Sequence, residues 1–136
     1  MFQTLAYFAT VFYRDFTAYT TGRLHKLGLS FGLLFPLTYV GKHPGCTQGE
    51  LTSALGLDWG YSQRSIARLV EDGFLTREKS GRAYRLNLSE KGQDAFGLSH
   101  QVFYDWDQER LSALEPAERE RLIALLAKVK RQDKER

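Results

Sequence analysis

The apolar residues at the start of the chain, over residues 2–24, recur with the spacing of a helix, which places them on one stripe. The stripe consists of Leu5, Phe8, Phe12, Phe16 and Tyr19. The apolar surface extends beyond that face through Phe2, Tyr7, Val11 and Tyr13. A helix that is apolar on most sides must be covered on most sides, and in so short a chain a second subunit is the expected cover. Burial within the same chain is the alternative.

A second helix with clear periodicity is expected near the end of the chain, over residues 116–131. Pro116 suits its first position, where a backbone N–H donor is not needed. The apolar stripe of this helix consists of Leu122, Leu125, Leu126 and Val129. A long helix capped by Ser89 is expected to precede it and to run to about Ser112. The charged tail, residues 130–136, is expected to fray.

Another apolar segment, residues 30–41, is expected to form a helix with Ser30 as its N-cap. Pro36 lies inside this segment and should kink or interrupt the helix, because proline lacks a backbone N–H donor. The residues from Lys42 to Gly45 then break the chain.

A pair of short helices is expected next. Thr47 and Glu50 have the spacing of a capping box, which predicts a helix over residues 48–55. Gly56 is placed to end that helix. A second helix, residues 59–72, is expected to follow, with an inner face of Ile66, Leu69 and Val70.

Asp58 can cap this second helix and Gly73 can end it. A β-hairpin is expected to follow, with a first strand that starts at Phe74 and a turn over residues 79–82. In its second strand, apolar and polar residues alternate as in a half-buried strand. The apolar positions are Tyr84, Leu86 and Leu88, and the polar ones are Arg85 and Asn87.

Composition places the chain among ordinary globular proteins. It has 136 residues, of which 43% are hydrophobic and 26% are charged, and these values favour a single folded domain. The net charge of +3 is compatible with a nucleic-acid partner but is common elsewhere, so the position of the charges matters more than their sum. Both apolar runs are too short to span a bilayer and no signal peptide is evident, so a soluble, cytoplasmic protein without a membrane partner is expected.

The order of helix, turn, helix and hairpin is that of a winged helix-turn-helix, in which one helix enters the major groove of DNA. Arg64 and Arg68 are four residues apart and therefore share a face, from which either can bind guanine, while Gln63 can bind adenine. The further candidates for DNA contact are Gln48, Tyr61, Ser62, Lys79 and Arg82.

These candidates have different expected targets. Gln48, Tyr61 and Ser62 lie at the starts of helices, where phosphates bind, and Tyr61 or Ser62 could also touch a thymine methyl. Arg82 is expected in an adjacent minor groove, with Lys79 beside the DNA backbone. The alternative for the arginines is a solvated face whose charge is balanced by acidic neighbours, namely Glu71, Asp72 and Glu78.

The chain resembles the MarR family of bacterial transcriptional regulators over essentially its whole length. The resemblance lies in HPGCTQGELTSALGLDWGYSQRSIARLVEDGFLTR, then a basic wing, then LNLSEKG and ALEPAERERLIALLAKV. It implies a mainly α fold with a small β-hairpin wing: a winged helix-turn-helix with N- and C-terminal dimerisation helices. Residues 1–28 and 112–136 would form the dimerisation helices, residues 29–92 the winged helix-turn-helix, and residues 93–111 a connecting helix.

The sequence departs from the family pattern in three places. The wing is short and Ser80 replaces the acidic residue usual two positions before Arg82. Trp59 and Gly60 stand where small residues or proline usually begin the recognition helix. Pro36 falls inside its helix rather than at its start.

Aromatic side chains near the dimerisation helices are candidates for an effector pocket or, equally, for packed core. They are Tyr7, Phe12, Phe35, Tyr39, Phe103, Tyr104 and Trp106. Cys46 is more often a filler than a redox switch in such a position, although a nearby helix N-terminus can lower a thiol pKa. The histidines lack metal-ligand spacing, and no catalytic cluster, metal site or cofactor is expected.

The sequence therefore predicts a homodimeric repressor that binds double-stranded DNA at a pseudo-palindromic operator and is released by a small aromatic or apolar effector. A winged-helix module that binds only another protein is the alternative, and Trp59 with Tyr61 on the outer helix face would suit it.

Overall fold

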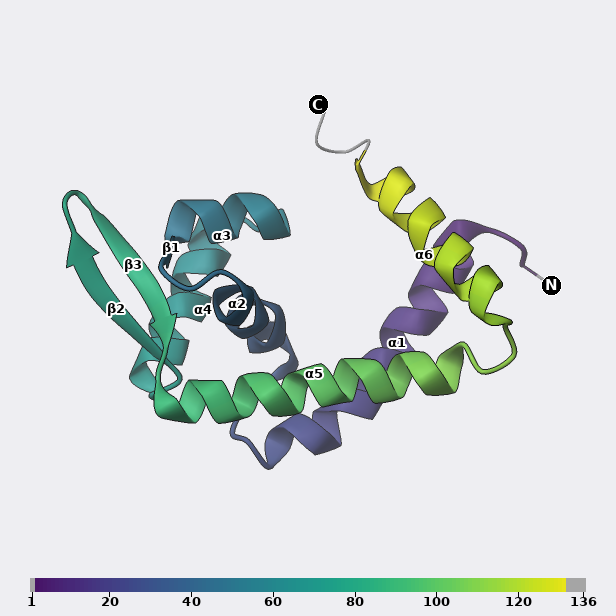
Figure 1. Cartoon of the computed structure of the whole chain (residues 1–136), viewed down its shortest axis with the longest axis horizontal. Coiled ribbons are helices and arrows are strands. Elements are labelled where there is room, and N and C mark those ends of the chain that lie inside the picture. The colour runs from purple at the N-terminus through teal and green to yellow at the C-terminus, as the bar shows by residue number, and fades with distance from the viewer. Residues whose placement is uncertain (1, 132–136) are drawn as a thin grey trace. The chain divides into compact units, whose positions relative to one another are not determined.

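The computed structural model describes residues 2–131, which form six helices and a small three-stranded antiparallel sheet (Figure 1). The elements in order are α1 (Leu5–His25), α2 (Phe31–Lys42), β1 (Cys46–Thr47), α3 (Gln48–Leu55), α4 (Trp59–Glu71), β2 (Leu75–Ser80), β3 (Ala83–Leu88), α5 (Glu90–Arg110) and α6 (Pro116–Arg131). The mainly α fold with a small wing is therefore confirmed. No helix in this part of the chain is long and apolar enough to cross a membrane.

The chain divides into two compact units, and the division falls within α5, after Phe103. The first unit contains α1 to β3 and most of α5. Its core is drawn from all of these elements and includes Leu24, Leu34, Leu51, Ile66, Leu69, Phe74 and Leu86. The second unit contains the end of α5 and α6, whose apolar side chains are largely exposed.

Most helix limits agree with the local signals in the sequence. α3 and α6 have the predicted bounds, and the capping box of Thr47 and Glu50 is present. α1 begins later than predicted, because the side chain of Thr4 accepts a hydrogen bond from the backbone N–H of Tyr7 and so caps the helix. Of the two outcomes predicted for Pro36, a kink or an interruption, the interruption is wrong, since α2 runs through it. The predicted fraying concerns residues 132–136, outside the described part, together with the last two residues of α6.

The wing has one more strand and a tighter turn than the sequence indicated. β1 pairs antiparallel with β3, with Cys46 opposite Leu86, and the strand order is β1-β3-β2. β2 and β3 pair up to Ser80 and Ala83, so only Gly81 and Arg82 form the turn. Gly81 has a φ of 65°, a left-handed conformation that a glycine adopts without strain.

The start of α5 is joined closely to the segment that follows α4. The hydroxyl of Ser89 accepts a hydrogen bond from Gly92 N at 3.0 Å and donates to the carbonyl oxygen of Phe74. Gly92 lies directly against this segment, and a Cβ atom at position 92 would overlap the backbone carbonyl of Phe74. The first turn of α5 therefore requires glycine at this position.

Gly92→Ala should lower the free energy of unfolding by about 1–3 kcal/mol, because backbone would have to move to admit the methyl group. Gly97→Ala, in the same helix, meets no atom within 4 Å and should raise it by up to about 1 kcal/mol through helix propensity. Guanidinium denaturation followed by circular dichroism measures both. Equal effects of the two substitutions would contradict the close approach at Gly92.

Candidate nucleic-acid interface

α4 has a buried face and an exposed polar face. On the buried face, Ile66 and Leu69 are completely enclosed, and the small side chain of Ser65 allows close packing. At its start, the side chain of Asp58 accepts a hydrogen bond from Tyr61 N at 3.0 Å, as predicted for the N-cap. Packing of the buried face and the N-cap at Asp58 thus hold the helix in place, and its opposite face is exposed.

The outer face of α4 presents three of the predicted DNA-contacting side chains, Gln63, Arg64 and Arg68, all of them exposed. Arg68 forms an ion pair with Asp72, with Nε 2.8 Å from Oδ2. This hydrogen bond to Asp72 raises the pKa of Arg68. Because the contact uses Nε, the two terminal nitrogens remain donors that can point away from the helix.

Gly60, one of the departures from the family pattern, lies beneath Arg64. A Cβ atom at position 60 would stand 3.2 Å from Nη1 of Arg64, so glycine leaves room for the guanidinium to lie along the first turn. Trp59 precedes it with 54% of its surface exposed. The start of α4 therefore carries an exposed aromatic ring in its first turn.

Two predicted contacts at the start of α4 are engaged with neighbouring helices. Ser62 is completely buried, and its hydroxyl shares a hydrogen bond of 2.6 Å with that of Thr52 on α3. Its side chain therefore joins the two helices and cannot contact DNA, which corrects the prediction. The hydroxyl of Tyr61 donates to the carbonyl oxygen of Gly32 on α2 at 3.1 Å, so this group faces α2.

Gln48 occupies the first position of α3, where a phosphate contact was predicted. Its side-chain nitrogen Nε2 is buried and has no hydrogen-bond partner among the described residues. A phosphate contact through this amide therefore requires the side chain to turn outward.

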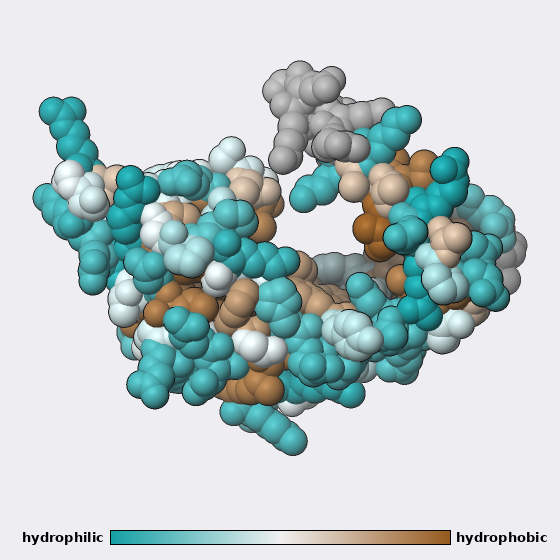
Figure 2. All heavy atoms as spheres, in the orientation of Figure 1, coloured by the Kyte–Doolittle hydropathy of each residue, from teal (hydrophilic) through white to brown (hydrophobic). Residues whose placement is uncertain are grey.

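The end of the wing is basic and solvent-exposed. Lys79 and Arg82 are both exposed, and Figure 2 shows hydrophilic residues over this end of the hairpin. The structure adds Arg77, which is exposed on β2 and lies 5.6 Å from the centre of the Tyr84 ring. Arg77 and Lys79 are two apart in one strand and share a face, a signal that the sequence contained.

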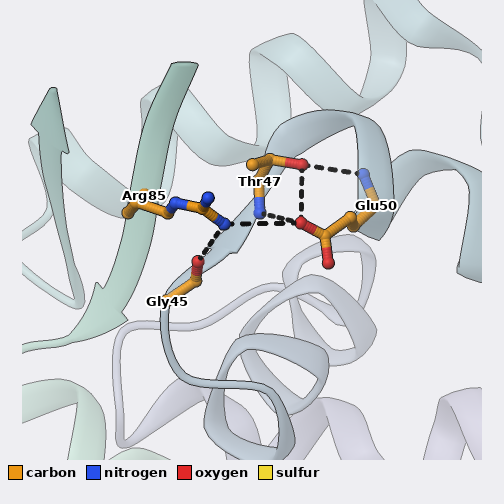
Figure 3. A network of polar contacts seen from close by, with 4 residues as sticks. All are labelled: Gly45, Thr47, Glu50 and Arg85. Atoms are coloured by element: carbon orange, nitrogen blue, oxygen red, sulfur yellow. Dashed lines mark hydrogen bonds and ion pairs between the residues drawn. The ribbon is translucent and has the colours of Figure 1, made fainter. Parts of the chain in front are cut away.

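A polar network fixes the wing to the start of α3 (Figure 3). Nη1 of Arg85 on β3 donates to the carbonyl oxygen of Gly45 at 3.2 Å and lies 3.7 Å from Oε1 of Glu50. The same carboxylate accepts a hydrogen bond from Thr47 N, within the capping box. One carboxylate therefore caps α3 and also contacts β3, which links the base of the wing to the start of α3.

The predicted effector residues take part in several different ring contacts. Phe35 and Phe103 stack with ring centres 5.4 Å apart, beside Phe16 and Phe31. Tyr39 instead stacks on His43 at the far end of α2. Tyr7 and Phe12 both contact Phe8 on α1, whereas Trp106 and Tyr104 belong to the second compact unit.

A separate groove of about 610 Å³ lies between α1 and α5, and none of the predicted effector residues lines it. Arg23, Lys26 and Tyr19 border it together with Leu98 and Val102. No group of three or more metal-ligating side chains occurs within the described residues.

Cys46 lies in β1 with 4% of its surface exposed. Burial raises the pKa of its thiol to about 11, and the nearby carboxylate of Glu50 adds to this rise. The lowered thiol pKa that a redox switch would need is therefore absent, and Cys46 is a core residue. This burial agrees with the place of Cys46 in β1, where it pairs with the buried Leu86 of β3.

Three comparisons place this fold among known proteins. A family model described as MarR family matches residues 37–85. The HTH-type transcriptional regulator BilQ of Clostridium symbiosum (strain WAL-14163) is 43% identical over 132 residues, which cover 95% of this chain and 92% of that relative. The solved structure of the transcriptional regulator SlyA matches with a TM-score of 0.91 at 21% identity, over 98% of this chain and 96% of that chain. Streptococcus pneumoniae FabT in complex with DNA matches with a TM-score of 0.79 at 16% identity, over 96% of each chain.

The three-stranded wing and the exposed polar face of α4 define a winged helix-turn-helix protein. The identity of 43% to BilQ, over nearly the full length of both proteins, shows to which family within this class the chain belongs. The chain belongs to the MarR family of transcriptional regulators, which confirms the resemblance seen in the sequence and places it outside the enzymes.

Cys46 should react with DTNB at pH 7 only when the protein unfolds, because the buried thiol is protonated and the thiolate is the nucleophile. Its native pKa of about 11 lies above the ordinary value of 9.0. Its contribution to stability is therefore complete below pH 9 and is lost as the pH rises towards 11. Labelling in native buffer and in guanidinium measures reactivity, and Cys46→Ala should reduce the alkaline loss of stability. Rapid labelling of the folded protein would contradict this assignment.

Proposed function

We propose that this protein is a transcriptional repressor that binds a pseudo-palindromic DNA operator as a homodimer. The observation that carries the proposal is the exposed face of α4, where Gln63, Arg64 and Arg68 lie together on a helix whose opposite face is completely buried. Membership of the MarR family supports it, as does the likeness of the fold to FabT in complex with DNA.

Each side chain has a distinct proposed role. Arg64 and Arg68 bind guanine edges in the major groove and Gln63 binds adenine, since these are the bidentate pairings that base edges favour. Arg82 at the wing turn lies near the minor groove, while Lys79 and Arg77 lie along phosphates. Ser62 is excluded from this set because it is buried.

The homodimer is supported by apolar surface that the single chain leaves uncovered. On α1, Leu5, Phe12 and Tyr13 have 60%, 47% and 61% of their surface exposed. On α6, the exposed apolar residues are Ile123, Leu125, Leu126 and Val129. Exposed patches of this kind in soluble proteins mark contacts with another chain. Pairing two copies would place two α4 helices in successive major grooves, about 34 Å apart.

Release from DNA is proposed to follow binding of a small aromatic or apolar effector near the cluster of Phe16, Phe31, Phe35 and Phe103. Phe35 remains 46% exposed in that cluster, which leaves a ring for a ligand to contact. An effector that binds better to a dimer with altered spacing of the α4 helices would lower DNA affinity by population shift.

Arg64→Ala and Arg68→Ala should each weaken operator binding by about tenfold or more, because one bidentate base contact contributes about 1–3 kcal/mol. The test is fluorescence anisotropy at several salt concentrations with DNA from upstream of the protein's own gene. The double variant should also show a shallower salt dependence. Arg121→Ala, an exposed change on α6, is the matched control and should bind normally.

Full affinity in the double variant, or wild-type affinity that does not change with salt, would contradict DNA reading by α4. If the double variant still binds a protein partner while wild type binds no DNA, the protein-interaction module is the correct alternative.

The protein should sediment as a dimer, and Leu126→Glu should convert it to a monomer with weaker operator binding. The substitution places a charge on an apolar stripe that pairing would bury. Lys128→Glu on the same helix replaces an exposed polar residue and should remain dimeric. Analytical ultracentrifugation measures all three proteins, and a wild-type monomer at micromolar concentration would rule out the dimer.

A further inference from the structure

α2 contains a proline at a position where a regular helix needs a backbone donor. The N–H of residue 36 would normally donate to the carbonyl oxygen of Gly32, four residues earlier. Pro36 has no N–H, and a proline ring crowds that carbonyl. The helix nevertheless continues from Phe31 to Lys42, so the carbonyl of Gly32 lacks the helical donor that residue 36 would supply.

Tyr61 supplies that donor from the first turn of α4. Its hydroxyl lies 3.1 Å from the carbonyl oxygen of Gly32 and donates to it. A Cβ atom at position 32 would stand 2.7 Å from the hydroxyl oxygen, closer than real Cβ atoms approach, so glycine makes room for the contact. The three residues have complementary roles. Pro36 removes a backbone donor, Gly32 leaves space for the hydroxyl of Tyr61, and Tyr61 restores a hydrogen bond to the carbonyl of Gly32.

The same turn of α2 also contacts α1 and α5 through aromatic rings. Phe31, the neighbour of Gly32, lies 5.8 Å from the ring centre of Phe16 on α1. Phe35, one turn later, stacks on Phe103 of α5. One short stretch of α2 is thus in contact with α1, α5 and the start of α4.

We propose that Tyr61 is a positioning residue that couples the recognition helix to the aromatic end of α2. Its hydrogen bond makes the start of α4 and the start of α2 move as one piece. A displacement of the rings around Phe31 and Phe35 then reaches α4 directly. The inference rests on the proposed DNA-binding function and extends it, since it assigns Tyr61 to the orientation of α4 and not to contact with DNA.

A double-mutant cycle between Tyr61→Phe and Pro36→Ala tests the coupling. Pro36→Ala restores the N–H at position 36, so the carbonyl of Gly32 regains its helical donor and the hydroxyl of Tyr61 becomes dispensable. Tyr61→Phe should lower operator affinity about fivefold in the wild-type background, the loss typical of one hydrogen bond. In the Pro36→Ala background the same change should have less than about a twofold effect.

Equal losses in the two backgrounds would overturn the proposal, because a hydroxyl that contacts DNA directly is indifferent to the residue at position 36. No loss in either background would overturn it as well. Tyr104→Phe removes an exposed hydroxyl from α5 and is the matched control, with unchanged affinity expected.

Hydrogen–deuterium exchange without DNA gives a second readout that does not depend on the proposed function. Tyr61→Phe should speed exchange in residues 59–66 about fivefold, and the double variant should exchange like Pro36→Ala alone. If this pattern appears and wild type binds no DNA, the DNA-binding proposal fails and the coupling of α2 to α4 stands. If wild type binds DNA and neither cycle shows coupling, the role of Tyr61 is wrong.

Discussion

The burial of one face of α4 is the constraint on which the rest of the first unit depends. Ile66 and Leu69 are completely enclosed, and full burial of such side chains contributes roughly 1.5–3 kcal/mol each. A polar helix face can be held toward a binding partner only if packing of the opposite face prevents the helix from rotating about its axis. α3 holds α4 through the hydrogen bond between Thr52 and Ser62, so the turn between the two helices is fixed by a contact as well as by packing.

The wing depends on the same small core. Leu86 of β3 is buried beside the helices, while Arg85 next to it reaches the carboxylate that also caps α3. Because alternate residues of a strand face opposite sides, one strand is bound to the core through its apolar side and to a helix end through its polar side. The hairpin is therefore attached at its base, well away from its turn.

Local signals in the sequence predicted the parts of the fold that local chemistry determines. The capping box at Thr47, the left-handed Gly56 and the proline at the start of α6 each act within one turn of chain, and all three are present. The missed features depend on distant partners. β1 exists only because it pairs with a strand about 40 residues later, and Ser62 is buried only because α3 packs over it. Pro36 did not interrupt α2, and the carbonyl of Gly32 accepts a hydrogen bond from Tyr61 of α4.

β2 lies at the edge of the sheet and pairs only with β3, so one side of its backbone is unpaired within the sheet. Open strand edges invite other chains to add on and aggregate, and charged side chains along the edge oppose this. Arg77, Glu78 and Lys79 stand on this strand in succession. The charges of the wing are thus placed to oppose pairing between sheet edges of two copies, a role separate from any contact with DNA.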